Sequence, residues 1–354
     1  MKKTVVICTV FLILLLGSGV LLLKAGQKEQ SEAAALKRGD LFVFLPGSEI
    51  SALFDDGNAL WVGGKGGIQL LDRLTGEPLK VLDAEIKMAY AAGICQTSDG
   101  TIWAGHNEGL TAFSAAGKTV YSISAPDIPG GRVNALLPDG DGLWIGTEQG
   151  AAYLAPASGN WQVKETLTSA NGLAADFTNC ITRVGGSLWF GAYLSNQGGG
   201  LSIRSPEGWQ YVSVKEGLPH RYINAIIPLS EQEVLVGTGH LDRGGLARLR
   251  LEDGSWRVSD TWNTDNGIPG EKVRQLFWDS GGQLWITTES HGLLLCESVT
   301  ALNTSPIPGL YLTEQSGLSD NEIKCIVETE EFFWLGGRLG LTRMERGDEK
   351  GGNL

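Results

Sequence analysis

Short runs of apolar residues alternate with Asp- and Gly-rich turns through most of the chain, from residue 41 to residue 345. Typical runs are VNALLP at 133–138, INAIIP at 223–228 and VRQLFW at 273–278. Runs of this length bounded by turn residues are typical of β-strands, and no segment after residue 40 shows a useful length of helical periodicity. The pattern therefore predicts an all-β protein.

A tryptophan phrase follows the apolar runs, as in GNALWVGG at 57–64, DGLWIGTEQG at 141–150 and EFFWLGG at 331–337. Its central position recurs every 41 to 50 residues. The seven members of this column are Trp61, Trp103, Trp144, Trp189, Leu235, Trp285 and Trp334. A period in the forties with several short strands per unit matches the blades of a propeller. We predict a seven-bladed β-propeller of four-stranded antiparallel blades over residues 40–345.

The tryptophan column is expected to be structural. On the second strand of a blade, an indole fills the wedge between that sheet and the next one around the ring. Burying ~150–250 Å² of each indole corresponds to roughly 4–6 kcal/mol before ordering costs.

The two ends of the repeat region are expected to share one blade. The last unit lacks an outer strand, whereas LFVFLPGSEI at 41–50 resembles an outer strand followed by a linker. An open ring would leave a bare sheet edge. We therefore predict that residues 41–45 pair onto the last blade as its fourth strand.

The N-terminus carries an uncharged apolar run between Lys3 and Lys24 that is long enough to span a bilayer as a helix. We read residues 1–24 as a transmembrane anchor, with a cleaved signal peptide as the alternative. Residues 25–39 then form a polar stalk, and residues 346–354 form a polar tail. Because Lys2 and Lys3 before the run favour the inside, we expect a single-pass protein of the bacterial inner membrane with the propeller on its periplasmic or extracellular side.

Charge and cysteine usage narrow the functional classes. The formal net charge is −12, so binding to nucleic acid is disfavoured. Cys95, Cys180 and Cys325 fall on the same apolar stretch of three units, and no zinc spacing is present. We interpret them as small core residues. We expect no metal and no cofactor, and we expect a monomeric ring.

The repeat also carries a family resemblance. The phrase V..L..D..G.LW.GT..GGL, preceded by linkers such as ANGL at 170–173 and QSGL at 315–318, resembles the two-component regulator propeller repeat. In that family the repeats form the extracytoplasmic sensor portion of bacterial hybrid histidine kinases and related membrane regulators. This sequence contains no kinase or receiver motif and no second apolar run. The resemblance thus implies an exported binding propeller rather than a kinase.

One aligned column supplies the strongest candidate binding residues. At the start of the innermost strand, the seven units carry Ser51, Gly93, Asn134, Asn179, Asn224, Arg274 and Lys324. These positions are expected to ring the channel entrance as a hydrogen-bonding collar. Its basic side suits a carboxylate or a sugar acid. In the alternative interpretation, the Asn side chains cap strand ends and bind channel water.

Further candidates lie in the loops and linkers of the same predicted face. They are His106, His220, His240 and His291, together with the linker residues Arg132, Phe177, Arg221, Tyr222 and Lys272. We expect a non-catalytic module that binds an extracytoplasmic protein, small ligand or glycan on this face. The alternative is a lyase or hydrolase acting on a carbohydrate-like ligand through His220, Glu289 and Arg274. Fold alone does not decide between them.

Overall fold

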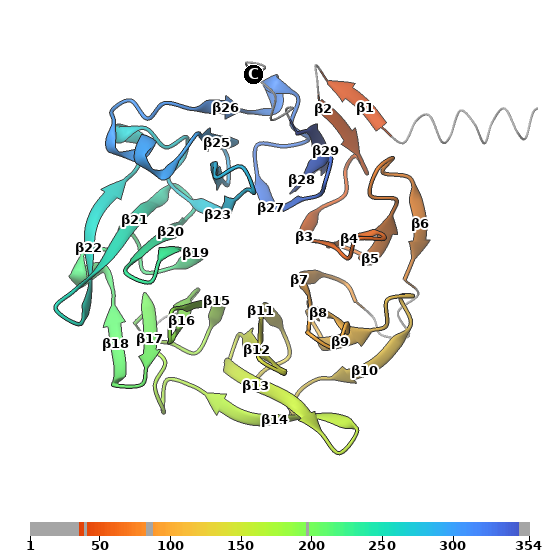
Figure 1. Cartoon of the computed structure of the whole chain (residues 1–354), viewed down its shortest axis with the longest axis horizontal. Helices are drawn as coiled ribbons and strands as arrows, with labels where there is room; N and C mark the ends of the chain where they lie inside the picture. Colours follow the sequence, from red (N-terminus) through yellow and green to blue (C-terminus); the bar gives the residue numbers. More distant parts are fainter. Residues whose placement is uncertain (1–34, 39–40, 83–87, 196–197, 347–354) are drawn as a thin grey trace, which may run out of the picture.

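The computed structural model describes residues 35–38, 41–82, 88–195 and 198–346. Seven antiparallel sheets surround a central axis, and this confirms the predicted seven-bladed propeller (Figure 1). Blades 1 to 6 have four strands each, in chain order from the axis outward. The second strand of each blade is buried at almost every position, so both faces of each sheet are covered and the core lies between the sheets.

From blade 1 to blade 7, the innermost strands are β3 (Ile50–Asp55), β7 (Ala91–Gln96), β11 (Val133–Asp139), β15 (Thr178–Val184), β19 (Ile223–Ser230), β23 (Val273–Trp278) and β27 (Ile323–Glu328). The second strands are β4 (Leu60–Gly64), β8 (Ile102–His106), β12 (Gly142–Thr147), β16 (Ser187–Ala192), β20 (Glu233–His240), β24 (Leu284–Thr288) and β28 (Phe332–Gly337). The third strands are β5 (Gly67–Leu71), β9 (Gly109–Phe113), β13 (Gly150–Ala157), β17 (Leu201–Ser205), β21 (Arg243–Glu252), β25 (Leu293–Cys296) and β29 (Gly340–Glu345). The outer strands of blades 1 to 6 are β6 (Pro78–Val81), β10 (Thr119–Ile123), β14 (Asn160–Leu167), β18 (Gly208–Val212), β22 (Ser255–Trp262) and β26 (Leu310–Leu312).

The ring closes through the two ends of the propeller, as predicted. Strand β2 (Leu41–Phe44) pairs antiparallel with β29, with Phe42 opposite Arg343. A further strand, β1 (Ala35–Arg38), pairs with β2 and gives blade 7 five strands. This segment lies in the predicted polar stalk, where no strand was expected. The predicted anchor at 1–24 and the tail at 347–354 lie outside the described residues.

No helix within the described ranges combines the length and the hydrophobicity needed to cross a bilayer.

The tryptophan column packs each blade against the next, as the sequence predicts. The indole of Trp103 in blade 2 lies edge-on to Trp161 in blade 3, with ring centroids 4.7 Å apart. Trp285 in blade 6 contacts Phe333 in blade 7 at 4.6 Å. The six indoles and Leu235 are at most 3 % exposed. Apolar burial between sheets therefore stabilises the ring.

The glycine two residues after the tryptophan lets neighbouring blades approach closely. A Cβ atom on Gly146 would lie 2.8 Å from Cγ2 of Thr178, and one on Gly237 would lie 2.6 Å from Cγ1 of Val273. Thr178 and Val273 each begin the innermost strand of the following blade. Glycine is thus required at these positions because any side chain would collide with the next blade.

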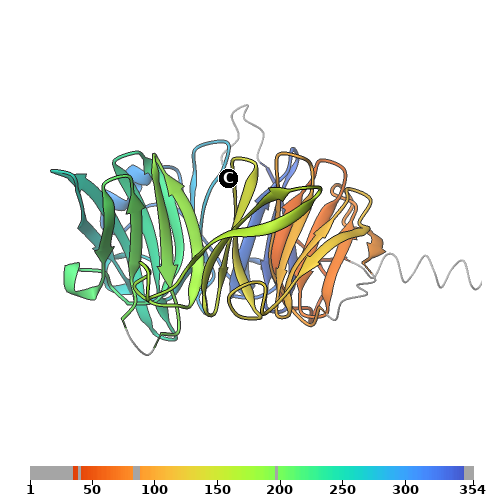
Figure 2. The ribbon, with the colours of Figure 1, turned by 90° about the horizontal axis from the view of Figure 1, so that it is seen from below.

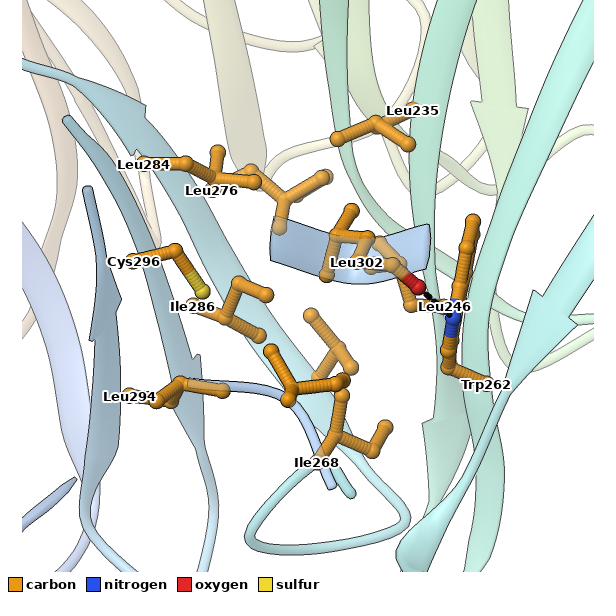
Figure 3. Packing of buried hydrophobic residues seen from close by; sticks show 13 residues of the cluster. Leu235, Leu246, Trp262, Ile268, Leu276, Leu284, Ile286, Leu294, Cys296 and Leu302 are labelled. Carbon is orange, nitrogen blue, oxygen red and sulfur yellow. Dashed lines mark hydrogen bonds between the residues drawn. The ribbon is translucent and has the colours of Figure 1, made fainter. Parts of the chain in front are cut away.

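Leu235 replaces tryptophan at the interface of blades 5 and 6, where other side chains fill the volume. Leu302 enters the same buried cluster from a short 3-10 helix, η3 (Val299–Asn303), which precedes the outer strand of blade 6 (Figure 3). The indole N–H of Trp262 donates to the Leu302 carbonyl at 2.8 Å. This insertion explains how the unit tolerates the smaller residue.

The described cysteines are unpaired and lie among apolar side chains. Burial raises the pKa of Cys95 and of Cys180 to about 12. Such thiols stay protonated and unreactive at neutral pH. The geometry agrees with the interpretation of these residues as small core side chains.

The linkers into the innermost strands and the loops between the second and third strands share one face of the ring, as predicted. The backbone N–H of Tyr193, after β16, donates to the carbonyl of Phe177 in the linker at 2.9 Å. The N–H of Glu289 donates to the Lys272 carbonyl at 3.1 Å in the same way. Figure 2 shows the strands running between the two faces of the ring. We call the face with these linkers the loop face.

Candidate ligand-binding site

Each innermost strand contains a β-bulge at its second residue. In blade 3, Val133 pairs with Thr147 and Ala135 with Gly146, so Asn134 has no partner in the ladder. The same register shift occurs in all seven blades. A bulge turns its extra residue away from the ladder. The seven bulged residues are Ser51, Ala92, Asn134, Asn179, Asn224, Arg274 and Lys324.

All seven bulged residues line one cavity of about 290 Å³ on the loop face, which we call the mouth cavity. The sequence alignment thus placed six of the seven correctly. In blade 2 it is wrong by one position, because Gly93 pairs with Gly105 and Ala92 is the bulged residue. The alignment treated the strands as regular and could not locate the shift in a run of small residues.

The polar bulged residues bridge neighbouring blades. The Nδ2 amide of Asn179 donates to the carbonyl of Ile223 at 3.0 Å, and the Ser51 hydroxyl donates to the carbonyl of Ala91 at 2.6 Å. Each acceptor belongs to the first residue of the next innermost strand. These bonds agree with the capping interpretation of the column. Two polar atoms of the collar, Asn134 Nδ2 and Asn224 Oδ1, are buried without a hydrogen-bond partner among the described residues.

The expected basic side of the collar is held in ion pairs. The Lys324 ammonium lies 2.5 Å from a carboxylate oxygen of Glu49 and 3.5 Å from one of Glu322. The Arg274 guanidinium lies 3.3 Å from Glu322. Partial burial opposes ionisation of Glu49, but the hydrogen bond and the charge of Lys324 outweigh it and lower the pKa of that carboxyl. The two glutamates compensate the charge that the sequence analysis counted as free.

An aromatic cluster borders the cavity on the side of blades 4 and 5. Ring centroids lie 5.7 Å apart for Phe177 and Tyr193, 5.2 Å for Tyr193 and Tyr222, and 5.5 Å for Tyr222 and His240. Phe177 and Tyr193 line the cavity itself. Behind them, the Arg221 guanidinium donates to the Tyr222 hydroxyl at 3.1 Å.

His220 is part of the same cluster, and a hydrogen bond occupies one of its two ring nitrogens. Its Nδ1 accepts from the backbone N–H of Tyr222 at 3.0 Å. Burial, followed by the positive charge of His240, Arg221 and Arg243, lowers the pKa of His220. The neutral ring is therefore favoured near neutral pH.

His291 lies in a separate cavity of about 550 Å³ between blades 5, 6 and 7, which we call the acidic cavity. Glu289 also lines it and pairs with the buried ammonium of Lys272 at 2.7 Å. The structure therefore does not bring together the alternative catalytic set, because Arg274 lines the mouth cavity, Glu289 the acidic cavity and His220 neither. Over the described ranges, no group of three His, Cys, Asp or Glu side chains is arranged to hold a metal ion.

His106 ends β8 beside the loop face and lines a further cavity of about 410 Å³ with Glu108 and Asp127, although its ring is almost fully buried. It is 1 % exposed, and its Nε2 lies 3.0 Å from the Thr111 hydroxyl. Burial lowers the pKa of His106 to about 4. The residue is therefore neutral at pH 7.

Tyr90, Tyr193 and the pairing role of Glu49 and Glu322 shape the site but were not predicted from the sequence. The sequence contains a pattern that includes most of them. The residues two positions before each bulged residue align with one another in the seven units. These residues are Glu49, Tyr90, Arg132, Phe177, Tyr222, Lys272 and Glu322. Three of these line the mouth cavity, and two others form the ion pairs with Lys324 and Arg274.

Comparison with known proteins supports the repeat that the sequence suggested. Residues 127–149 match the family model described as two component regulator propeller, as the resemblance predicts. No curated protein matches the chain at a significant level.

Solved structures share the fold at low sequence identity. The extracellular domain of BT3049 from B. thetaiotaomicron, titled a hybrid two component system, superposes with a TM-score of 0.71 at 20 % identity, over 86 % of this chain and 41 % of that one. The extracellular domain of BT4673 from the same organism, titled a one component system, gives 0.68 at 19 % identity, over 88 % and 40 %. PorZ of Porphyromonas gingivalis, titled an essential bacterial surface component of the type-IX secretion system, gives 0.60 at 16 % identity, over 87 % and 47 %. The chain thus spans less than half the length of these proteins.

Proposed function

We propose that this chain is an extracytoplasmic sensor propeller that binds a small ligand in the mouth cavity without catalysing its conversion. One observation carries the proposal: every blade directs a bulged residue into the same cavity. Because all seven repeats contribute to this cavity, a ligand bound there lies between all seven blades. Concave sites with a few convergent polar groups are the usual place for a ligand.

The state of the charged groups supports binding over catalysis. A general acid or base needs a proton to exchange and a pKa near the working pH. Glu49 and Glu322 are held in ion pairs with Lys324, and Glu289 is held with Lys272. None of these carboxylates lines the mouth cavity, whereas a catalytic pair would have to face the same reacting atom.

The similar structures support the sensor part of the proposal. Two of them are extracellular domains of signalling systems by their titles. At 19–20 % identity this similarity establishes the fold, and a fold hosts many functions. The predicted anchor at 1–24 would tether the ring outside the inner membrane, with signalling carried by another part of the pathway.

A substitution that fills the mouth cavity tests the proposal. Ala92 has the smallest side chain of the seven bulged residues. Its methyl group makes no hydrogen bond, so Ala92→Phe removes none. Sugars, peptides and organic acids are screened against the full-length chain by thermal shift. A ligand present at about 100 times its Kd stabilises the native state by about 2.7 kcal/mol.

The expected result is that one ligand class stabilises the wild type and fails to stabilise the Ala92→Phe variant. The matched control is Val120→Phe, which adds an aromatic ring on the outer strand β10, where Val120 is 59 % exposed. Equal stabilisation of Ala92→Phe would show that the mouth cavity is not the site. Turnover of the bound ligand would contradict the non-catalytic assignment.

A further inference from the structure

The lining of the mouth cavity has an unusual charge for this protein. Three cationic residues, Arg132, Arg274 and Lys324, contribute to it, and none of its lining residues is an aspartate or glutamate. The chain as a whole has a formal net charge of −12. The acidic cavity nearby has the opposite lining, with six carboxylates including Glu271 and Glu289.

Only one of the three cations remains uncompensated. Arg274 and Lys324 are paired with Glu322 and Glu49, neither of which lines the mouth cavity. Arg132 is exposed, and among the described residues no carboxylate lies within ion-pair distance of it.

The environment of Arg132 leaves its guanidinium available. The guanidinium carbon lies 5.8 Å from the ring centroid of Tyr90, which supports the side chain from one side. Glu148 lies nearby, since its Oε1 accepts a hydrogen bond from the Gly131 N–H at 3.3 Å, but it makes no ion pair with Arg132. A guanidinium without a carboxylate partner retains a planar set of donors that matches a carboxylate.

Other parts of the same lining are apolar. Phe177, Tyr193 and Leu194 line the cavity together with Arg132, and Leu194 is 48 % exposed. Rings and a leucine side chain provide a surface on which the flat face of a cyclic molecule can pack. The amides of Asn134 and Asn224, each with one unpartnered polar atom, add hydrogen-bonding groups.

We propose that the mouth cavity selects an organic carboxylate with a cyclic body, whose carboxylate pairs with Arg132 while its ring packs on Phe177 and Tyr193. This inference rests on the proposed function, because it names the ligand class of the same site. A sugar acid and an aromatic acid share this chemistry, and the experiment separates them.

The experiment measures binding of glucuronate and benzoate to the full-length chain by calorimetry, with glucose and benzyl alcohol as neutral counterparts. At least one carboxylate is expected to bind more tightly than its neutral counterpart. Arg132→Gln should weaken that binding about 10- to 100-fold, as loss of a charge-assisted bidentate contact does. Arg257→Gln removes the same charge from the exposed outer strand β22 and should leave the affinity unchanged.

The outcomes separate the two proposals. If neither carboxylate binds, or if Arg132→Gln and Arg257→Gln bind the carboxylate equally well, the carboxylate inference is wrong. The proposed function still holds in that case if another ligand loses its binding in Ala92→Phe. If Ala92→Phe weakens the binding of none of the ligands, the proposed function is wrong and so is the carboxylate inference. Preference for glucuronate over benzoate would identify a sugar acid, and the reverse an aromatic acid.

Discussion

The Nδ2 amide of Asn224 in blade 5 donates to the backbone carbonyl of Val273 in blade 6 at 2.9 Å. It also donates to the carbonyl of Gly239 at 3.0 Å. Separate sheets of a propeller share no backbone ladder, so a side chain that bonds across the gap connects them directly. The residues that shape the mouth cavity are therefore also residues that join the blades.

Replacing Asn224 with alanine should destabilise the protein. The change removes two hydrogen bonds and leaves two carbonyl groups without these donors, which corresponds to about 1–3 kcal/mol. Asn134→Ala is the matched control, because Asn134 occupies the same position in blade 3 and its Nδ2 has no partner. Urea unfolding of the two variants measures the difference. An equal loss of stability in both would show that the bond to Val273 contributes nothing specific.

The close contact between blades predicts a cost for enlarging the glycine of the tryptophan phrase. A Cβ on Gly237 would lie 2.6 Å from Cγ1 of Val273, so Gly237→Ala should destabilise the native state by about 1–3 kcal/mol through overpacking. Gly186→Ala is the control, since a Cβ there meets nothing within 4 Å. Thermal unfolding should show a lower Tm for Gly237→Ala alone. A Tm of Gly237→Ala at or above that of the wild type would mean that the blades move apart without cost.

Buried His106 predicts a pH dependence of stability. Its pKa falls from 6.5 to about 4 on folding, so below pH 6.5 the unfolded chain binds a proton that the native state does not. Stability is therefore complete above pH 6.5 and decreases as the pH falls toward 4. The full effect is up to about 3 kcal/mol for this change in pKa.

The pH dependence is tested by comparing unfolding free energies at pH 7.5 and pH 4.5. The His106→Gln variant should lose less stability between these two pH values than the wild type does. His291→Gln serves as the control, because His291 is exposed on the loop face. If His106→Gln and the wild type lose the same amount, the burial of a neutral imidazole does not govern the acid sensitivity.

The architecture could be predicted from the sequence because it repeats. Seven copies of one phrase fix the number of blades, and the missing outer strand of the last unit predicts the pairing of Leu41–Phe44 with β29. The bulged residues could be predicted for the same reason, apart from blade 2. There, small residues on both sides of Ala92 give no pattern that locates the bulge.

Local electrostatics could not be predicted in the same way. Glu322 is separated from Lys324 by one residue in the sequence, yet its contact with Arg274 of the preceding blade depends on how the blades face each other. The ion pair of Lys324 with Glu49 joins opposite ends of the chain through ring closure. Aligning the repeats shows which residues occupy equivalent positions. The charge of the cavity, however, depends on ion pairs between residues at different repeat positions.

The substitution of tryptophan by leucine at position 235 provides a test of how the interface of blades 5 and 6 is filled. Leu235 is fully buried in one cluster with Leu302, which the η3 insertion supplies (Figure 3). Restoring the repeat with Leu235→Trp should therefore destabilise the protein by about 1–3 kcal/mol, since the volume of the indole is already occupied.

Combining Leu235→Trp with Leu302→Ala tests the cause of this effect. The second change alone removes buried methyl groups and should cost about 2–5 kcal/mol. If the two side chains compete for one volume, the double variant should be more stable than the sum of the single effects predicts. Unfolding free energies of the four proteins give this coupling directly. Strict additivity, or an increase in stability from Leu235→Trp alone, would show that the η3 insertion does not fill the place of the missing indole.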